Sequence, residues 1–303
     1  MTRIKRAAWF LLFFVLAPVA LGAVEGEAPV PVTIIPKTTG FFKTNFKYMV
    51  AGGPSEEVRI PIPFYVILHP QGVVLFDSGL GEDFREQVHG WWAHRLFQLL
   101  LPYQFKKSDA AVQQLKRMGI PPEAVRVLVV SHMHLDHVGG LRDFPNATVV
   151  VSRTEWESAN VGRWRARLRG VMKEQLEGIE KRLRLVDFQP GTAVGPFDAS
   201  DDLFGDGSLI LLPTPGHTPG HESLLVTLGS GKRVFLTGDA VWVRENYLRP
   251  APKSWFIRHF EENCDEAWET TLKIKEFSEK NPDVLIIPGH DPHVWKELPE
   301  EMR

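Results

Sequence analysis

Three histidines and an aspartate occupy a stretch of six residues, His132-Met-His-Leu-Asp-His137. Imidazole nitrogen and carboxylate oxygen are ligands for zinc, and also for iron, manganese or cobalt. In an extended segment, side chains two residues apart point the same way, so His132 and His134 can converge on one ion. Asp136 and His137 follow where the chain turns and can hold a second ion nearby. The pattern predicts a metal site rather than a polar loop with a chance cluster of histidines.

Strands must position these ligands. The run at 125–130 is apolar and rich in β-branched residues, which predicts a buried strand that ends at the cluster. Three further apolar segments, at 209–212, 233–236 and 284–287, end shortly before a histidine or an aspartate. Because strand ends meet at one edge of a sheet, ligands remote in sequence can come together there. A two-ion site with a bridging carboxylate needs about seven groups, and the chain supplies His132, His134, Asp136, His137, His217, Asp239 and His290.

The strands also suggest an internal repeat. A hairpin at 64–76 ends in Asp77, and a hairpin of the same design at 223–236 ends in Asp239. Two such copies predict two similar halves, each with its own sheet. Helical patterns cover 83–101, 108–118, most of 153–185, and 261–279. Alternating strands and helices predict an α/β fold.

Composition narrows the function classes. The chain has 303 residues with a formal net charge of -2, which gives no global attraction for nucleic acid. We therefore expect a small-molecule substrate and no nucleic acid. The single cysteine, Cys264, allows neither an internal disulfide nor a thiolate zinc site.

The first residues predict export. Arg3, Lys5 and Arg6 precede an apolar run that ends in small residues near position 23, the layout of a secretory signal peptide. An uncleaved anchor is the alternative. We expect a periplasmic or extracellular protein with a signal peptide at 1–23, a proline-rich linker at 24–36 and one folded domain at 37–303.

Several surface features have two interpretations. The aromatic segment at 41–55 fits a hairpin or a loop, and its rings fit core packing or a pocket wall. Trp91 and Trp92 fit packing onto a sheet, or a membrane or dimer surface. The basic residues at 163–184 fit a solvated helix face, or contact with an anionic membrane surface.

The motifs HMHLDH, PGH, TGDA and PGHD resemble those of the metallo-β-lactamase superfamily. The resemblance implies a four-layered αβ/βα sandwich with two divalent metal ions, zinc first, at one edge. It assigns His132, His134 and His217 to the first ion, Asp136, His137 and His290 to the second, and Asp239 to both. After residue 60, the chain is more closely similar to N-acyl-homoserine lactonases.

One position departs from the lactonase pattern. Those lactonases carry a tyrosine three residues after the bridging aspartate, where this chain has Trp242. Indole can donate a hydrogen bond but cannot act as an acid near neutral pH. Tyr247 and Asp136 are the alternative proton donors, and Trp242 is a candidate wall of an acyl pocket.

The resemblance implies opening of the lactone ring of N-acyl-homoserine lactones by a metal-bridging hydroxide. Asp136 would carry the proton to the leaving group. Asp77 and His221 are candidates for orienting the ligand histidines, with purely structural turn roles as the alternative. The alternatives in function are a thioesterase like glyoxalase II, a phosphodiesterase or a β-lactamase, although β-lactamases lack the bridging carboxylate. A redox or non-catalytic metal-binding protein is a third class.

Overall fold

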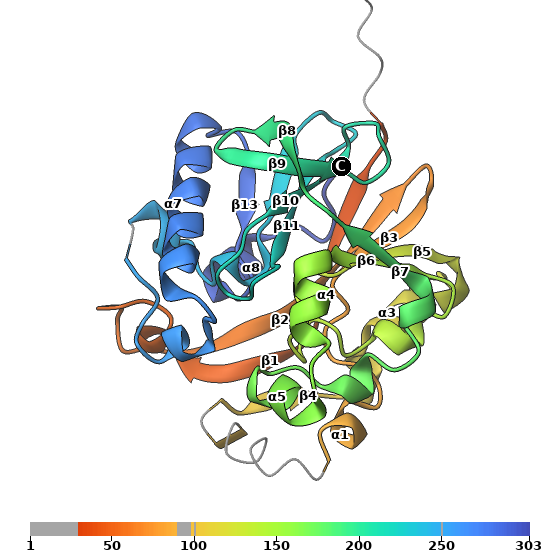
Figure 1. The fold of residues 1–303 in the computed structure, drawn as a ribbon, viewed down its shortest axis with the longest axis horizontal. Helices are drawn as coiled ribbons and strands as arrows, with labels where there is room; N and C mark the ends of the chain where they lie inside the picture. Colours follow the sequence, from red (N-terminus) through yellow and green to blue (C-terminus); the bar gives the residue numbers. More distant parts are fainter. Residues whose placement is uncertain (1–29, 90–97, 100, 250) are drawn as a thin grey trace, which may run out of the picture.

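Two β-sheets lie face to face in the computed structural model, which describes residues 30–89, 98–99, 101–249 and 251–303 (Figure 1). The first sheet has the strand order β4-β1-β2-β3-β5-β6-β7, and the second has the order β13-β12-β11-β10-β9-β8. The first sheet contains β1 (Thr33–Asn45), β2 (Glu57–His69), β3 (Gly72–Phe76), β4 (Tyr103–Phe105), β5 (Val125–Val129), β6 (Thr148–Ser152) and β7 (Leu183–Val186). The second contains β8 (Gln189–Val194), β9 (Phe197–Asp202), β10 (Leu209–Pro213), β11 (Glu222–Thr227), β12 (Arg233–Leu236) and β13 (Leu285–Ile287).

The two predicted hairpins are confirmed. Tyr65 of β2 pairs antiparallel with Phe76 of β3, and Leu224 of β11 pairs antiparallel with Leu236 of β12. Beyond each hairpin the next strand is parallel, because β3 pairs with β5 and β12 pairs with β13. Each half thus brings consecutive parallel strand ends to the same edge, as the prediction of two similar halves requires.

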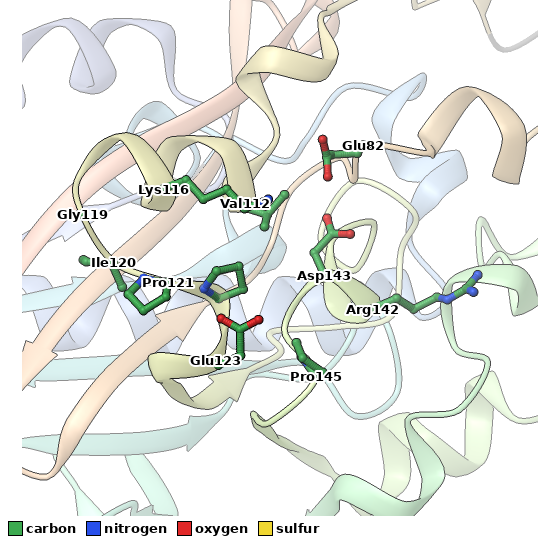
Figure 2. Close-up of a pocket in the computed structure, with 11 residues that line it drawn as sticks. Glu82, Val112, Lys116, Gly119, Ile120, Pro121, Glu123, Arg142, Asp143 and Pro145 are labelled. Carbon is green, nitrogen blue, oxygen red and sulfur yellow. The ribbon is translucent and has the colours of Figure 1, made fainter.

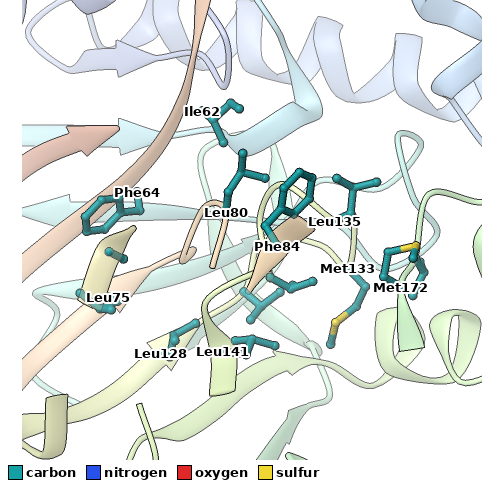
Figure 3. Packing of buried hydrophobic residues seen from close by; sticks show 14 of the residues in the cluster. Ile62, Phe64, Leu75, Leu80, Phe84, Leu128, Met133, Leu135, Leu141 and Met172 are labelled. Atoms are coloured by element: carbon teal, nitrogen blue, oxygen red, sulfur yellow. The ribbon is translucent and has the colours of Figure 1, made fainter. Parts of the chain in front are cut away.

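Alternating side chains build the layers. Val74 and Phe76 of β3 belong to the core between the two sheets, whereas Leu75 belongs to the cluster on the outer face of the first sheet. This alternation follows from the two-residue period of a strand. The outer cluster also contains buried side chains of the loop that carries His132–His137, which we call the ligand loop; among them are Met133 and Leu135 (Figure 3). The ligand loop is therefore anchored in the hydrophobic core.

Helices cover both outer faces, which completes a four-layered αβ/βα sandwich (Figure 1). On the first sheet these are α1 (Phe84–Gln87), α3 (Ala111–Arg117), α4 (Arg153–Ala159) and α5 (Arg163–Leu168). On the second sheet, α7 (Cys264–Lys280) buries Ile274 and Phe277. Two short helices, α6 (Glu245–Leu248) and α8 (Pro292–Glu297), follow β12 and β13. The predicted amphipathic helix at 261–279 is confirmed, with its start three residues later.

Several boundaries differ from the sequence prediction. β1 begins at Thr33, so the last four residues of the expected linker pair with β2. In the aromatic segment, β1 continues to Asn45 and is followed by a 3-10 turn at Phe46–Tyr48. The region 153–185 contains two short helices, two 3-10 turns and the start of β7 instead of being mostly helical. Pairing of β7 with β6 satisfies the backbone there in place of helical hydrogen bonds.

Some predictions fall outside the described residues. These are the signal peptide at 1–23, the first part of the linker, and Trp91 and Trp92 within the expected helix at 83–101. In the part of the chain that the structure covers, none of the helices combines the length and the apolar composition that crossing a bilayer requires.

Candidate metal centre

The seven predicted ligands come together at the edge where the strand ends meet. The ligand loop follows β5, His217 lies in the β10–β11 loop, Asp239 follows β12 and His290 follows β13. Their donor atoms form three overlapping groups, within each of which the atoms lie within 4.8 Å of one another. The groups are His132 with His134 and His217, His132 with His137 and Asp239, and Asp136 with His137 and His290.

His132, His134 and His217 surround one point. Their ring centroids are 4.6–4.7 Å apart, and the ring planes are close to perpendicular, at 79–88°. His217 Nε2 lies 2.9 Å from His134 Nδ1. Three imidazoles crowded edge to face at this separation can direct their nitrogens at a single cation.

Asp239 lies between this group and the other. Its Oδ2 is 3.4 Å from His217 Nε2, while its Oδ1 is 3.4 Å from His137 Nε2 and 3.2 Å from His290 Nε2. Asp136 closes the second group, with Oδ2 3.8 Å from Nε2 of both His137 and His290. One carboxylate thus faces both groups with different oxygens.

The residues fit divalent metal ions. His132 Nε2, His137 Nε2 and Asp239 Oδ1 are buried, and none has a hydrogen-bond partner among the described residues. Burying polar atoms without partners is costly, so the cluster is built for a ligand that these atoms bind. The nitrogen and oxygen donors suit zinc and other first-row metals.

The electrostatics agree with cation binding. Burial, together with neighbouring imidazoles, lowers the pKa of His132 and His134 well below the usual value, which favours the neutral form that binds metals. Burial also lowers the pKa of His137, but Asp239, Asp77 and Asp136 outweigh it and raise that pKa well above the usual value. A field that attracts a proton this strongly also attracts a metal cation.

Two of the ligand histidines are oriented by groups of the first sheet that lie outside the ligand loop. Asp77 Oδ2 lies 2.8 Å from His137 Nδ1 and accepts a hydrogen bond of 2.8 Å from the Ser131 hydroxyl. Asp77 has φ of +59°, a conformation that is uncommon for a residue other than glycine. His290 Nδ1 lies 2.7 Å from the carbonyl oxygen of Pro61. The ring orientations are thus set by the fold and not by the ligand loop alone.

His221 holds the backbone of Asp239 and does not contact a ligand histidine through a hydrogen bond. The Asp239 N–H donates to His221 Nε2 at 3.0 Å, and His221 Nδ1 lies 2.8 Å from the Thr214 hydroxyl. His221 is buried, and burial lowers its pKa well below the usual value. A neutral His221 can accept the Asp239 N–H, so it supports the carboxylate that faces both groups.

Sequence reasoning missed Glu155, which joins two ligand loops. Its Oε1 accepts the Met133 N–H at 2.8 Å, and its Oε2 accepts the Gly220 N–H at 3.1 Å. The Ser152 hydroxyl caps α4 and donates to the Gly220 carbonyl at 2.7 Å. The Ser152-x-x-Glu155 spacing of a capping box was a visible signal, although here the glutamate turns toward the loops instead of the helix end.

A second pair that sequence reasoning missed is Lys253 and Glu261. Glu261 Oε1 lies 3.3 Å from His217 Nδ1, and Lys253 Nζ lies 2.6 Å from the same oxygen. Lys253 belongs to no motif or periodic pattern, and Glu261 is only the first residue of the predicted helical pattern at 261–279. No signal in the sequence could have identified them, because the segment that carries them folds back onto His217 only in the tertiary structure.

A pocket of about 610 Å³ opens above the ligand cluster. Its apolar lining residues are Phe42, Leu101, Leu135, Leu168, Trp242 and Phe260, and its charged lining residues include Arg167, Arg169, Glu261 and Glu262. Gly170 has φ of +75°, and a Cβ there would lie 3.1 Å from the ring of His134. This glycine lets the turn after α5 approach the cluster closely enough to form one wall.

The two proton-donor alternatives and Trp242 lie in different surroundings. Asp136 and Trp242 both line the pocket, and the Trp242 ring lies 4.9 Å from the ring of His290. Trp242 Nε1 is buried and has no hydrogen-bond partner among the described residues. Tyr247 packs in the hydrophobic cluster beneath α7 and is not among the residues that line the pocket. Burial, then the charge of Asp291, raises its pKa to about 12. The structure thus brings Asp136 to the cluster and does not bring Tyr247 there.

A cavity of similar size, about 660 Å³, lies away from the ligands (Figure 2). Glu82 and Asp143 lie next to each other there, and burial together with the charge of Glu82 raises the pKa of Asp143 to about 7. It contains no histidine among its lining residues. Its donors therefore do not extend the metal cluster.

The comparisons with known proteins agree with this geometry. The sequence profile of the Metallo-beta-lactamase superfamily matches residues 59–290. N-acyl homoserine lactonase AttM from Rhizobium radiobacter is 33% identical over 251 residues, which cover 82% of this chain and 89% of AttM.

Two solved structures share the fold. One is AiiA of B. thuringiensis, in a variant with N-decanoyl-L-homoserine bound at the active site. It has a TM-score of 0.71 and 24% identity, and the match covers 89% of this chain and 97% of AiiA. The other is AidC, a dizinc quorum-quenching lactonase in complex with a product. It has a TM-score of 0.62 and 16% identity, and the match covers 87% of this chain and 89% of AidC.

Proposed function

The chain belongs to the metallo-β-lactamase superfamily, and from this premise we propose that it hydrolyses the lactone ring of N-acyl-homoserine lactones. The observation that carries the proposal is a cluster of seven candidate ligands, five of which line a pocket that also has apolar lining residues. An acyl chain can pack against the apolar residues, and the polar lactone can reach the cluster. The relationship to AttM supports the choice of substrate class.

We assign two divalent ions, zinc first, to the cluster. His132, His134 and His217 would hold one, Asp136, His137 and His290 the other, and Asp239 would contact both. When bound, such ions act as Lewis acids and lower the pKa of a bound water, which is the chemistry that hydrolysis at neutral pH requires. The protein's part is to orient the ligands and to keep the cluster buried.

The proposed reaction adds one water to the lactone carbonyl carbon and breaks its bond to the ring oxygen. The products are a carboxylate and a hydroxyl group on the same chain, with one proton released. We propose that Asp136 transfers a proton to the ring oxygen, because its side chain lines the pocket and is 13% exposed. Trp242, one of the apolar lining residues, would pack against the acyl chain or the lactone ring of the substrate.

The test is a substrate panel at pH 7 with the purified, metal-loaded protein. It contains acyl-homoserine lactones of several chain lengths, a thioester and a phosphodiester, and the Asp239→Ala protein serves as the control. We expect ring opening, which is measured as proton release and as a mass gain of one water. Failure to open a lactone of any acyl length would contradict the proposal, and turnover of the thioester or phosphodiester alone would favour the alternatives.

We also propose that the protein is exported, to the periplasm or beyond the cell. The basic residues and the apolar run before position 23 support this proposal, and they lie outside the described residues. Fractionation of cells that express a C-terminally tagged chain tests it, together with sequencing of the mature N-terminus. Full-length protein in the cytoplasmic fraction would contradict it.

A further inference from the structure

A buried ion pair lies directly behind His217. Lys253 Nζ is 2.6 Å from Glu261 Oε1, and the two side chains are only 6% and 1% exposed. Glu261 Oε1 lies 3.3 Å from His217 Nδ1. Lys253 Nζ also donates a hydrogen bond of 2.8 Å to the carbonyl oxygen of Asp239. The pair therefore contacts two members of the metal cluster from outside it.

The contact with Glu261 determines which nitrogen of His217 can bind a metal. His217 Nε2 faces the cluster, 2.9 Å from His134 Nδ1 and 3.4 Å from Asp239 Oδ2. The proton of the neutral ring must then reside on Nδ1, where Glu261 accepts it. A carboxylate in this place fixes the tautomer and makes the opposite nitrogen a stronger ligand.

Lys253 keeps Glu261 charged and in position. A carboxylate with a 1% exposed side chain requires a partner, since an unpaired buried charge is costly. Lys253 supplies that charge and links it to the backbone of Asp239. The segment is also tied to the His217 loop by main-chain bonds, because the N–H groups of Glu262 and Asn263 donate to the carbonyls of His217 and Gly216 at 3.0 Å. Changing the Glu261 side chain thus leaves these attachments in place.

We infer that Glu261 is a positioning residue for His217, and that the Lys253–Glu261 pair sets how tightly the group His132, His134 and His217 holds its ion. The group of His137 and His290 depends instead on Asp77 and the Pro61 carbonyl. Loss of the Glu261 carboxylate should therefore weaken binding of the ion at His132, His134 and His217 and leave the other ion bound. The inference rests on the proposed metal centre and not on the identity of the substrate.

Metal retention tests this inference without any activity measurement. Zinc-loaded Glu261→Gln protein is dialysed against increasing concentrations of a chelator, and the zinc content per chain is measured by elemental analysis. We expect one of two ions to leave at about 10–100-fold lower chelator concentration than in the wild type. In the cobalt-substituted protein, the visible ligand-field bands should change as well. The control is Glu297→Gln, an exposed glutamate that pairs with Arg244 away from the pocket and should retain both ions.

A second variant separates positioning from simple support of the fold. Glu261→Gln leaves Lys253 buried without its partner, so Lys253→Met/Glu261→Gln removes both charges. We expect the metal-free double variant to melt closer to the wild type than Glu261→Gln does, while it still releases one ion early. Wild-type retention in either variant would overturn the inference, as would equal release from Glu297→Gln. A wild-type protein that opens no lactone would overturn only the proposed function, because metal release is measured separately.

Discussion

Asp77 and Asp239 follow equivalent hairpin strands in the two halves, yet they contribute differently to the site. Asp77 comes directly after β3, adopts φ of +59° and turns its carboxylate toward His137 Nδ1. In the second half, Gly238 takes the left-handed conformation, with φ of +51°, and Asp239 follows it into the cluster. The first aspartate orients a histidine, and the second reaches both ligand groups.

The two halves provide equivalent strand ends, and the backbone conformation of each turn determines where the aspartate side chain lies relative to the histidines. A shift of two residues relative to the strand end moves a carboxylate from behind a histidine to in front of it. The residue three positions after each aspartate shows the same divergence. Leu80 is fully buried in the outer core, whereas Trp242 lines the pocket.

Among the variants that test this comparison, Asp239→Ala should have the largest effect. It removes the carboxylate that faces both groups, so we expect loss of metal and a fall in kcat/KM of at least about 10³-fold, or about 4 kcal/mol. Elemental analysis and steady-state kinetics measure the two effects. Asp198→Ala, which removes an exposed partner of Lys273, is the control. Full metal content in Asp239→Ala would show that this aspartate does not link the groups.

Asp77→Asn should have a smaller effect, because an orienting group acts through its histidine. Asparagine tolerates the left-handed conformation and keeps the size of the side chain, so mainly the charge is lost. We expect metal affinity or activity to fall about 10–100-fold. Asp187→Asn, which loses a half-exposed pair with Arg153, should behave as the wild type. An effect as large as that of Asp239→Ala would erase the distinction between the two aspartates.

Gly238→Ala tests the turn itself. A Cβ at this position would lie 2.9 Å from both His221 Nε2 and Ser131 Cβ. Gly231 has φ of +80° with open space around it, so Gly231→Ala isolates the cost of the conformation, about 1–2 kcal/mol. Thermal unfolding should show that Gly238→Ala costs about 1–3 kcal/mol more than Gly231→Ala, because its neighbours must shift. Equal losses would mean that close packing is unimportant in this turn.

Glu222→Gln tests the acidic surroundings of the orienting aspartate. Glu222 is buried, and burial, then the charges of Glu155, Asp201 and Asp77, raise its pKa well above the usual value. In the unfolded chain the Glu222 carboxyl group ionises near pH 4.5, whereas in the folded protein it stays neutral to higher pH. Glu222 therefore lowers the free energy of unfolding as the pH rises above 4.5. The glutamine variant should melt a few degrees higher than the wild type at pH 8.5, with little difference at pH 4. A gain that is independent of pH would contradict this assignment.

Trp242→Tyr is the mildest change. If position 242 faces the substrate, the phenol can replace the indole and lactonase activity should remain within about tenfold of the wild type or rise, since about 1.4 kcal/mol corresponds to tenfold. Trp242→Phe, which lacks a polar hydrogen, is the matched control and should be the less active of the two. Complete loss in the tyrosine variant with folding intact would argue against a substrate-facing position.

The sequence by itself predicted the candidate ligands and the arrangement of the chain in two similar halves. His132 and His134 share one side of an extended segment because of the strand period, and apolar runs before each ligand mark the strand ends. The recurrence of hairpins at 64–76 and 223–236 likewise indicated two halves. These features depend on the spacing of neighbouring residues within each strand, so they can be recognised before the arrangement of the strands is known.

Only the tertiary structure decided the surroundings of the ligands. Glu155, Lys253 and Glu261 reach the cluster through segments that no periodicity connects to it. Tyr247, which seemed available as a proton donor, is instead packed beneath α7. Side-chain contacts between distant segments depend on how loops return to the site, and that is set by packing of the whole chain rather than by the spacing of neighbouring residues.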